Sequence, residues 1–200
     1  MRGFTLIELL VVLGISALLS AIAITYTGVE RNQIALSVET SKIVGSILRA
    51  KELSVVTYAQ SPNVCAYGVA FNVAQGTYSL FGFSPDPAKY GGPGSIPPCP
   101  GAASTTAAGI SSSTEMIQYS LESWSVPPAN GVRLQSGGGG DDLAVVLFYP
   151  PAPVTLISRD GTSFLDPQTT PNTTSRVHLT TSDGKSSSTI SVNVAGQVNF

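Results

Sequence analysis

The stretch FTLIELLVVLGISALLSAIAI, residues 4–24, is an apolar run that a single charged residue, Glu8, interrupts. At about 1.5 Å per residue, a helix of this length spans roughly 30 Å, the thickness of the hydrocarbon core of a bilayer. Arg2 precedes the run, and a cationic flank favours keeping that end of the chain in the cytoplasm. The sequence therefore predicts one transmembrane helix in the cytoplasmic membrane, with the C-terminal part of the chain outside.

The helical pattern continues beyond this run, and no proline occurs before Pro62. Apolar residues recur at the spacing of one helix face, in steps of seven, four and three, at Leu36, Ile43, Ile47 and Ala50. We therefore expect one long helix over about residues 4–58. Its first half, residues 4–24, is apolar on all sides, whereas the second half, within residues 25–60, is amphipathic and suited to packing against a sheet.

After Pro62 the pattern changes to short runs rich in β-branched and aromatic residues. Seven runs are predicted strands: residues 64–73, 77–83, 116–121, 143–149, 154–158, 176–181 and 189–194. Turn dipeptides follow or separate several of them: Gln75-Gly76, Asp160-Gly161 and Asp183-Gly184. A helix followed by successive antiparallel strands predicts an α+β fold with a globular β-rich domain over residues 61–200.

The composition is that of an extracellular β-rich domain with long loops. Only 11% of the residues are charged, against roughly a quarter in ordinary soluble proteins. Residues 84–113 and the glycines around 137–140 are predicted surface loops. The net charge of -2 provides no overall attraction for nucleic acid, so DNA binding is not expected.

The two cysteines, Cys65 and Cys99, fit one disulfide formed in an oxidising compartment. Such a bond would close a loop of about 34 residues and stabilise the fold by roughly 3 to 4 kcal/mol. A pair of free structural thiols is the alternative reading of these two residues.

The first fifteen residues, MRGFTLIELLVVLGI, resemble the processing signal of type IV prepilins and type II secretion pseudopilins. The shared features are a short basic leader that ends in glycine, then Phe, a small polar residue, Leu-Ile and Glu. The resemblance implies that prepilin peptidase removes the leader, residues 1–3, by cleaving after Gly3. It also implies methylation of the new amino group of Phe4 and a role for Glu8 in assembly.

An acidic residue inside a membrane costs on the order of 2.5 to 3.5 kcal/mol near the centre of the bilayer. Cleavage before Phe4 creates a cationic amine that could neutralise Glu8 of a neighbouring subunit. Two opposite charges about 4 Å apart attract by roughly 4 kcal/mol at an effective dielectric constant near 20, which is comparable with the cost of burial. The pair could therefore set the register of helices in a filament.

The resemblance implies a type IV pilin-like fold and the function of a minor pilin or pseudopilin. The last twelve residues, TISVNVAGQVNF, also resemble the closing strands of GspH/FimT-like pseudopilins. Its expected partners are prepilin peptidase, other pilin or pseudopilin subunits, assembly platform proteins and the cytoplasmic membrane. The mature subunit would then enter a pilus or pseudopilus on the periplasmic or extracellular side.

Several alternatives compete with this interpretation. The apolar run could be an ordinary secretory signal peptide, cleaved at the small residues Ala21-Ile22-Ala23, or a plain single-pass anchor. In either case the chain would be an exported adhesin or ligand-binding domain, and it would be membrane-anchored if the run is not removed. A mature chain that begins at Ile24 would favour the signal peptide.

An enzymatic function is not expected, and neither is a cofactor. No GxSxG nucleophile motif and no phosphate-binding loop occur, and His178 is the only histidine. Asp141 and Asp142 follow four glycines and could contribute to a Ca²⁺ site, but two carboxylates are too few to form one alone. We expect a solvated acidic turn there, and no metal site is predicted.

Overall fold

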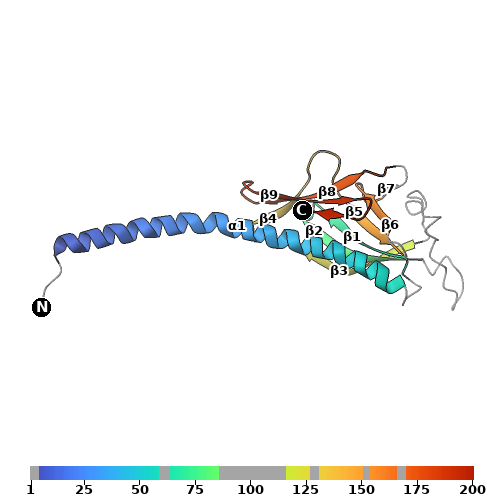
Figure 1. The fold of residues 1–200 in the computed structure, drawn as a ribbon, viewed down its shortest axis with the longest axis horizontal. Coiled ribbons are helices and arrows are strands. Elements are labelled where there is room, and N and C mark those ends of the chain that lie inside the picture. Colours follow the sequence, from blue (N-terminus) through green and yellow to red (C-terminus); the bar gives the residue numbers. More distant parts are fainter. Residues whose placement is uncertain (1–4, 59–63, 86–115, 127–130, 151–153, 166–169) are drawn as a thin grey trace.

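The computed structural model describes residues 5–58, 64–85, 116–126, 131–150, 154–165 and 170–200. Side chains are described for all of these except residues 23–30, 57–58, 85 and 116–119. The described part of the chain forms one long helix and two antiparallel β-sheets (Figure 1). This is the expected α+β architecture, and it is compatible with a pilin fold.

Helix α1 (Leu6–Tyr58) covers almost the whole predicted range of residues 4–58. Its first half extends away from the sheets, and its second half lies along them (Figure 1). The four apolar residues that predicted an amphipathic second half are all buried: Leu36, Ile43, Ile47 and Ala50. The absence of proline therefore gives one continuous helix that links an exposed stalk to the domain core.

The larger sheet has six strands in the order β3-β2-β1-β5-β6-β7. They are β1 (Ala66–Asn72), β2 (Thr77–Pro85), β3 (Met116–Ser125), β5 (Val145–Tyr149), β6 (Val154–Ser158) and β7 (Phe164–Leu165). The smaller sheet has the order β10-β9-β8-β4. Its strands are β4 (Val132–Gln135), β8 (Thr174–Thr181), β9 (Ser187–Asn193) and β10 (Val198–Asn199).

All seven predicted runs contain strands of the structure, with ends shifted by a few residues. The three predicted turns are confirmed, since Gly76, Gly161 and Gly184 have φ values of 64°, 82° and 67°. Only glycine adopts this left-handed region at little cost. The strands β4, β7 and β10 lie outside the seven predicted runs, because runs of four and two residues carry too little alternation to be distinguished from loops.

One hydrophobic core joins α1 to both sheets. It contains Ile43 and Ile47 from the helix, Val69 and Phe148 from the larger sheet, and Ile190 from the smaller one. A second buried cluster lies on the opposite face of the larger sheet and includes the residues Cys65, Phe81, Leu147 and Leu156. The second half of α1 is thus held by burial of apolar surface, which stabilises it by about 1.5–3 kcal/mol per large side chain.

The predicted disulfide involves one residue inside and one outside the described part of the chain. Cys65 is buried just before β1, and its N–H donates to the carbonyl oxygen of Phe83 at 2.7 Å. Cys99 falls in the predicted loop of residues 84–113, of which residues 86–113 lie outside the described residues. The Cys65–Cys99 bond therefore stays a prediction.

Gly68 on β1 lies where the backbone has no room for a side chain. A Cβ atom there would collide with the carbonyl oxygen of Val146 and lie 2.8 Å from the ring of Phe81. We expect Gly68→Ala to lower the stability of the domain by about 1–3 kcal/mol or more, because the opposing backbone cannot move aside. Thermal unfolding of the detergent-solubilised chain, followed by circular dichroism, measures this loss.

Gly45→Ala is the matched control for that measurement. No atom lies within 4 Å of a Cβ built on Gly45, which sits in the middle of α1. The control should be more stable than the parent chain by about 0.5–1 kcal/mol, because alanine loses less conformational freedom in a helix than glycine does. Equal melting temperatures for Gly68→Ala and the parent chain would contradict the described packing of β1 on β5.

Candidate functional site

The start of α1 places Glu8 in a capping box. Thr5 is the N-cap residue: its Oγ1 accepts a hydrogen bond from the Glu8 N–H at 3.4 Å. In return, the Glu8 carboxylate accepts bonds from the Thr5 N–H at 3.3 Å and from Thr5 Oγ1 at 3.1 Å. A pair of this kind satisfies two backbone donors that a helix start otherwise leaves free.

Glu8 therefore already has partners in its own chain before any neighbouring subunit arrives. The sequence contained the signal for this cap, since Thr5 and Glu8 have the S/T-x-x-E spacing of a capping box, but our sequence reasoning missed it. Gly3 and Phe4 lie outside the described residues. The predicted contact between the Phe4 amine and Glu8 of a neighbour thus stays a prediction, as does cleavage after Gly3.

The first half of α1 exposes an unusually large apolar surface. Eleven large apolar side chains between residues 6 and 22 are 52–84% exposed: Leu6, Ile7, Leu9, Leu10, Val11, Val12, Leu13, Ile15, Leu18, Leu19 and Ile22. Burial of the exposed surface of these side chains is favourable by a free energy of about 1 kcal/mol for each side chain, or about 10 kcal/mol in total. Surfaces of this size are typical of contacts with lipid or with another protein.

Among the helical residues with described side chains, which leave out residues 23–30, no stretch combines the length and the apolar character of a membrane span.

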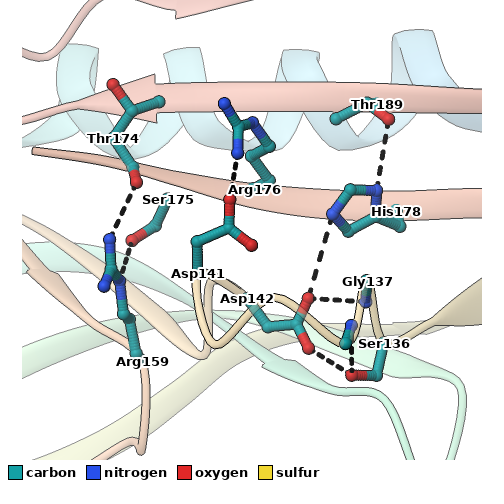
Figure 2. Close-up of polar contacts among 11 residues, drawn as sticks. Ser136, Gly137, Asp141, Asp142, Arg159, Thr174, Ser175, Arg176, His178 and Thr189 are labelled. Atoms are coloured by element: carbon teal, nitrogen blue, oxygen red, sulfur yellow. Dashed lines mark hydrogen bonds and ion pairs between the residues drawn. The ribbon is translucent and has the colours of Figure 1, made fainter.

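A second group of polar residues gathers where the two sheets meet (Figure 2). We call Asp141, Asp142, Arg176 and His178 the β8 polar cluster. The loop of residues 136–140 leaves β4 and returns the chain to β8, where the Arg176 N–H donates to the Asp141 carbonyl at 2.8 Å. The Leu143 N–H in turn donates to the Arg176 carbonyl at 2.7 Å, just before the chain enters β5 of the other sheet. This crossing brings residues that are distant in sequence together.

Each acidic residue of the β8 polar cluster has a partner. Asp141 forms an ion pair with the Arg176 guanidinium, and Asp142 accepts hydrogen bonds from Ser136 Oγ and from the Gly137 N–H, the latter at 2.8 Å. His178 is oriented through its Nδ1, which lies 3.2 Å from Thr189 Oγ1. Its Nε2 is 3.9 Å from the Asp142 carboxylate (Figure 2).

One ligand atom from each of Asp141, Asp142 and His178 lies within 4.8 Å of the others, a spacing that a single cation could bridge. However, a cation there would compete with Arg176 for Asp141 and with two hydrogen-bond donors for Asp142. It would also need room beside His178 Nε2. Gly137 lies so close to this atom that a Cβ added to Gly137 would collide with the His178 ring. The geometry fits an anchor for the loop of residues 136–142, in which both carboxylates are only partly exposed and the turn is less solvated than expected. The expectation that no metal binds there stays a prediction. Sequence reasoning did not group His178 with the two aspartates, because only the topology joins them.

The pKa of Asp142 gives the β8 polar cluster a predicted pH dependence. Burial raises this pKa, but the hydrogen bonds from Ser136 and Gly137, with a contribution from His178, outweigh burial and lower it below its ordinary value of 3.8. A carboxylate with a lowered folded pKa contributes stability above its unfolded pKa and loses it as the pH falls through the folded pKa. The hydrogen bonds of exposed Asp183, chiefly from Thr181 Oγ1, lower the pKa of that carboxyl too.

We therefore expect Asp142→Asn to lower the free energy of unfolding by about 1–3 kcal/mol at pH 7, because hydrogen bonds to a charged group contribute about this much. The difference between the variant and the parent chain should begin to shrink below about pH 4, where the carboxylate of the unfolded parent chain becomes protonated, and should continue to shrink as the pH falls through the lower pKa of the folded chain. Melting temperatures of both chains between pH 7 and pH 3 test this. A difference that stays constant over that range would show that the Asp142 charge does not hold the loop.

Comparison with known proteins bears on the N-terminus. Residues 1–24 match the family model described as the prokaryotic N-terminal methylation motif. This match supports a type IV pilin-like protein, and it implies processing by prepilin peptidase, assembly with other pilins and a membrane-anchored precursor. No characterised protein sequence and no solved structure shows significant similarity to the chain.

Proposed function

We propose that this chain is a structural subunit, a GspH/FimT-like minor pilin or pseudopilin of a type IV pilus or a type II secretion pseudopilus. Prepilin peptidase cleaves the precursor after Gly3 and methylates Phe4. The apolar half of α1 then anchors the subunit in the cytoplasmic membrane, crossing it once, until assembly moves the helix into the filament core. The domain stays on the outer side throughout.

The observation that carries this proposal is the exposed apolar half of α1. Residues 6–22 expose apolar side chains around the helix, whereas residues 36–50 of the same helix are anchored in the domain core. A stretch of this kind is unstable in water and requires a covering of lipid or of other helices. In a pilin-like subunit, lipid covers this surface while the helix is in the membrane, and neighbouring helices cover it in the filament.

Glu8 gives the assembly its proposed specificity. In the isolated chain its carboxylate bonds to Thr5, next to the position where cleavage would free the Phe4 amine. In a bundle of helices with little water, the amine of a neighbouring copy is a stronger partner than a hydroxyl, because both groups are charged. When Glu8 exchanges Thr5 for the Phe4 amine of a neighbouring copy, only helices in the correct register can form the new pair, so assembly depends on register.

The proposed partners follow from the same features. They are prepilin peptidase, other pilin or pseudopilin subunits, assembly platform proteins and the lipid of the cytoplasmic membrane. DNA is not a proposed partner, since the net charge of -2 and the scattered Lys and Arg residues favour no contact with phosphates. The proposed subunit is not an enzyme; an exported hydrolase is the competing enzymatic hypothesis, and an activity screen would test it.

Shearing of intact cells tests the proposal. Expressed with its assembly machine, the chain should appear in the sheared filament fraction, or in pseudopili when the secretion system is overproduced. It should remain in the membrane fraction in cells that lack prepilin peptidase. A chain that stays entirely in the membrane when filaments form normally would instead support the membrane-anchored adhesin or ligand-binding domain.

A further inference from the structure

A cleft of about 380 Å³ opens between α1 and the β2–β3 side of the larger sheet. Arg49, which lines the cleft, links the helix to β3: its guanidinium lies 2.7 Å and 3.1 Å from the two carboxylate oxygens of Glu122. The volume of the cleft is within the range of about 300–1,000 Å³ that is typical of small-molecule sites. No step of the proposed assembly uses this cleft.

Two aromatic rings form the sheet side of the cleft. Tyr78 and Trp124 are direct partners in the pairing of β2 with β3, so their side chains lie on the same, helix-facing side. Their ring centroids are 5.2 Å apart with an interplanar angle of 28°. Tyr78 is buried and Trp124 only partly so, which leaves part of the indole available to a ligand.

The charges around the cleft balance one another. Glu39, whose side chain is only 3% exposed, accepts a hydrogen bond from Lys42 Nζ at 2.8 Å, and Arg49 pairs with Glu122. Burial and the negative charge of Glu39 raise the pKa of the Tyr78 hydroxyl, and they outweigh its hydrogen bond with Ser46, which lowers it. Perturbed groups in a concave site are a mark of binding sites. A charged ligand would leave one of the four ionised groups without its partner, whereas a neutral polar ligand would not.

Gly45 forms part of the helix side of the cleft. A glycine in the middle of a helix costs roughly 0.5–1 kcal/mol relative to alanine. Packing does not require glycine here, because a Cβ at this position would have no neighbour within 4 Å. The missing side chain leaves this part of the cleft open.

We propose that this cleft is a binding site for a neutral saccharide. One face of a pyranose ring is made of C–H groups and can pack on the exposed part of Trp124, while its hydroxyls point outward. Lys and Arg donate up to three and five hydrogen bonds, so Lys42 and Arg49, which line the cleft, retain capacity for these hydroxyls beyond their ion pairs. The subunit would thereby carry a glycan-binding function in addition to its role in assembly.

The cleft contains its own reporter, since Trp124 is the only tryptophan in the chain. The experiment titrates the full-length chain, in a polyoxyethylene detergent without a sugar headgroup, with the methyl glycosides of glucose, galactose, mannose and N-acetylglucosamine. We expect at least one of them to change the tryptophan fluorescence saturably in the millimolar range or below. Absence of a saturable change with all four would overturn the proposal.

Two matched substitutions in one helix separate binding from folding. Gly45→Leu places a side chain in the cleft and should weaken binding by at least about tenfold, whereas Gly14→Leu makes the same change in the half of α1 away from the cleft and should bind within about twofold of the parent chain. If Gly45→Leu lowers the melting temperature, Arg49→Gln is the substitute, and a loss of about threefold or more is expected. Unchanged affinity in the folded variant of this pair would show that the fluorescence change arises elsewhere.

A further comparison tests the class of ligand. Methyl glucuronide carries a negative charge and methyl glucosaminide a positive one, and both should bind less tightly than the best neutral glycoside. Tighter binding of either charged sugar would contradict the argument from balanced charges and would exclude a neutral ligand as the preferred class.

Discussion

Replacing Glu8 with alanine or with glutamine is expected to leave membrane insertion and cleavage largely intact but to reduce incorporation into filaments by more than tenfold. The Phe4 amine and a carboxylate about 4 Å away attract by roughly 4 kcal/mol at an effective dielectric constant near 20. A loss of this size corresponds to a factor of about a thousand in an equilibrium constant. The amount of each variant in the sheared filament fraction, relative to the membrane fraction, measures the effect.

The two substitutions differ in what they preserve. Glutamine at the third helical position can still close a capping box with Thr5, whereas alanine cannot. A third variant, Thr5→Ala, removes the cap and keeps the carboxylate. If the charge pair controls assembly, Glu8→Gln should fail as Glu8→Ala does, and Thr5→Ala should assemble.

The opposite pattern would reassign the role of Glu8. Normal incorporation of Glu8→Gln together with failure of Thr5→Ala would mean that the helix cap, and not the charge, is what assembly requires. Normal incorporation of all three variants would contradict both roles and would leave the acidic residue in the apolar run without a function.

Gly3→Val is expected to block maturation almost completely. The proposed cleavage site lies directly after Gly3, and a β-branched side chain there would have to enter the space that the peptidase provides for glycine. The precursor should therefore accumulate with its leader, residues 1–3, still attached. Mass spectrometry of the purified membrane protein distinguishes the two forms.

Gly14→Val is the matched control, because it makes the same change in the apolar part of the chain that follows the proposed cleavage site, within α1. A Cβ on Gly14 would have no neighbour within 4 Å, so the substitution should be accommodated and the chain should mature normally. Normal maturation of Gly3→Val would show that prepilin peptidase does not recognise this junction.

Much of the fold could be predicted because the determining signals are local. The helix follows from a long stretch without proline and from the spacing of Leu36, Ile43, Ile47 and Ala50, all of which face the core. The turns at Gly76, Gly161 and Gly184 follow from the ability of glycine to adopt a positive φ. Period-two runs then place the strands between them.

What could not be predicted depends on contacts between distant parts of the chain. His178 lies beside Asp142 only because the loop after β4 returns to β8, and Trp124 lines a cleft with Arg49 only because β3 pairs with β2. No local pattern specifies which strands become neighbours, so neither the β8 polar cluster nor the cleft was predicted. The capping box of Thr5 and Glu8 is different, because its spacing was visible in the sequence and was overlooked.

The most direct test of the account is the N-terminal residue of the mature wild-type chain, determined by mass spectrometry of protein purified from cells that contain prepilin peptidase. The account predicts a chain that begins at Phe4 with a methylated amino group and retains Glu8 as its fifth residue. A chain that begins at Ile24, or one that keeps Met1, would contradict it, because neither form could place a free amine beside Glu8.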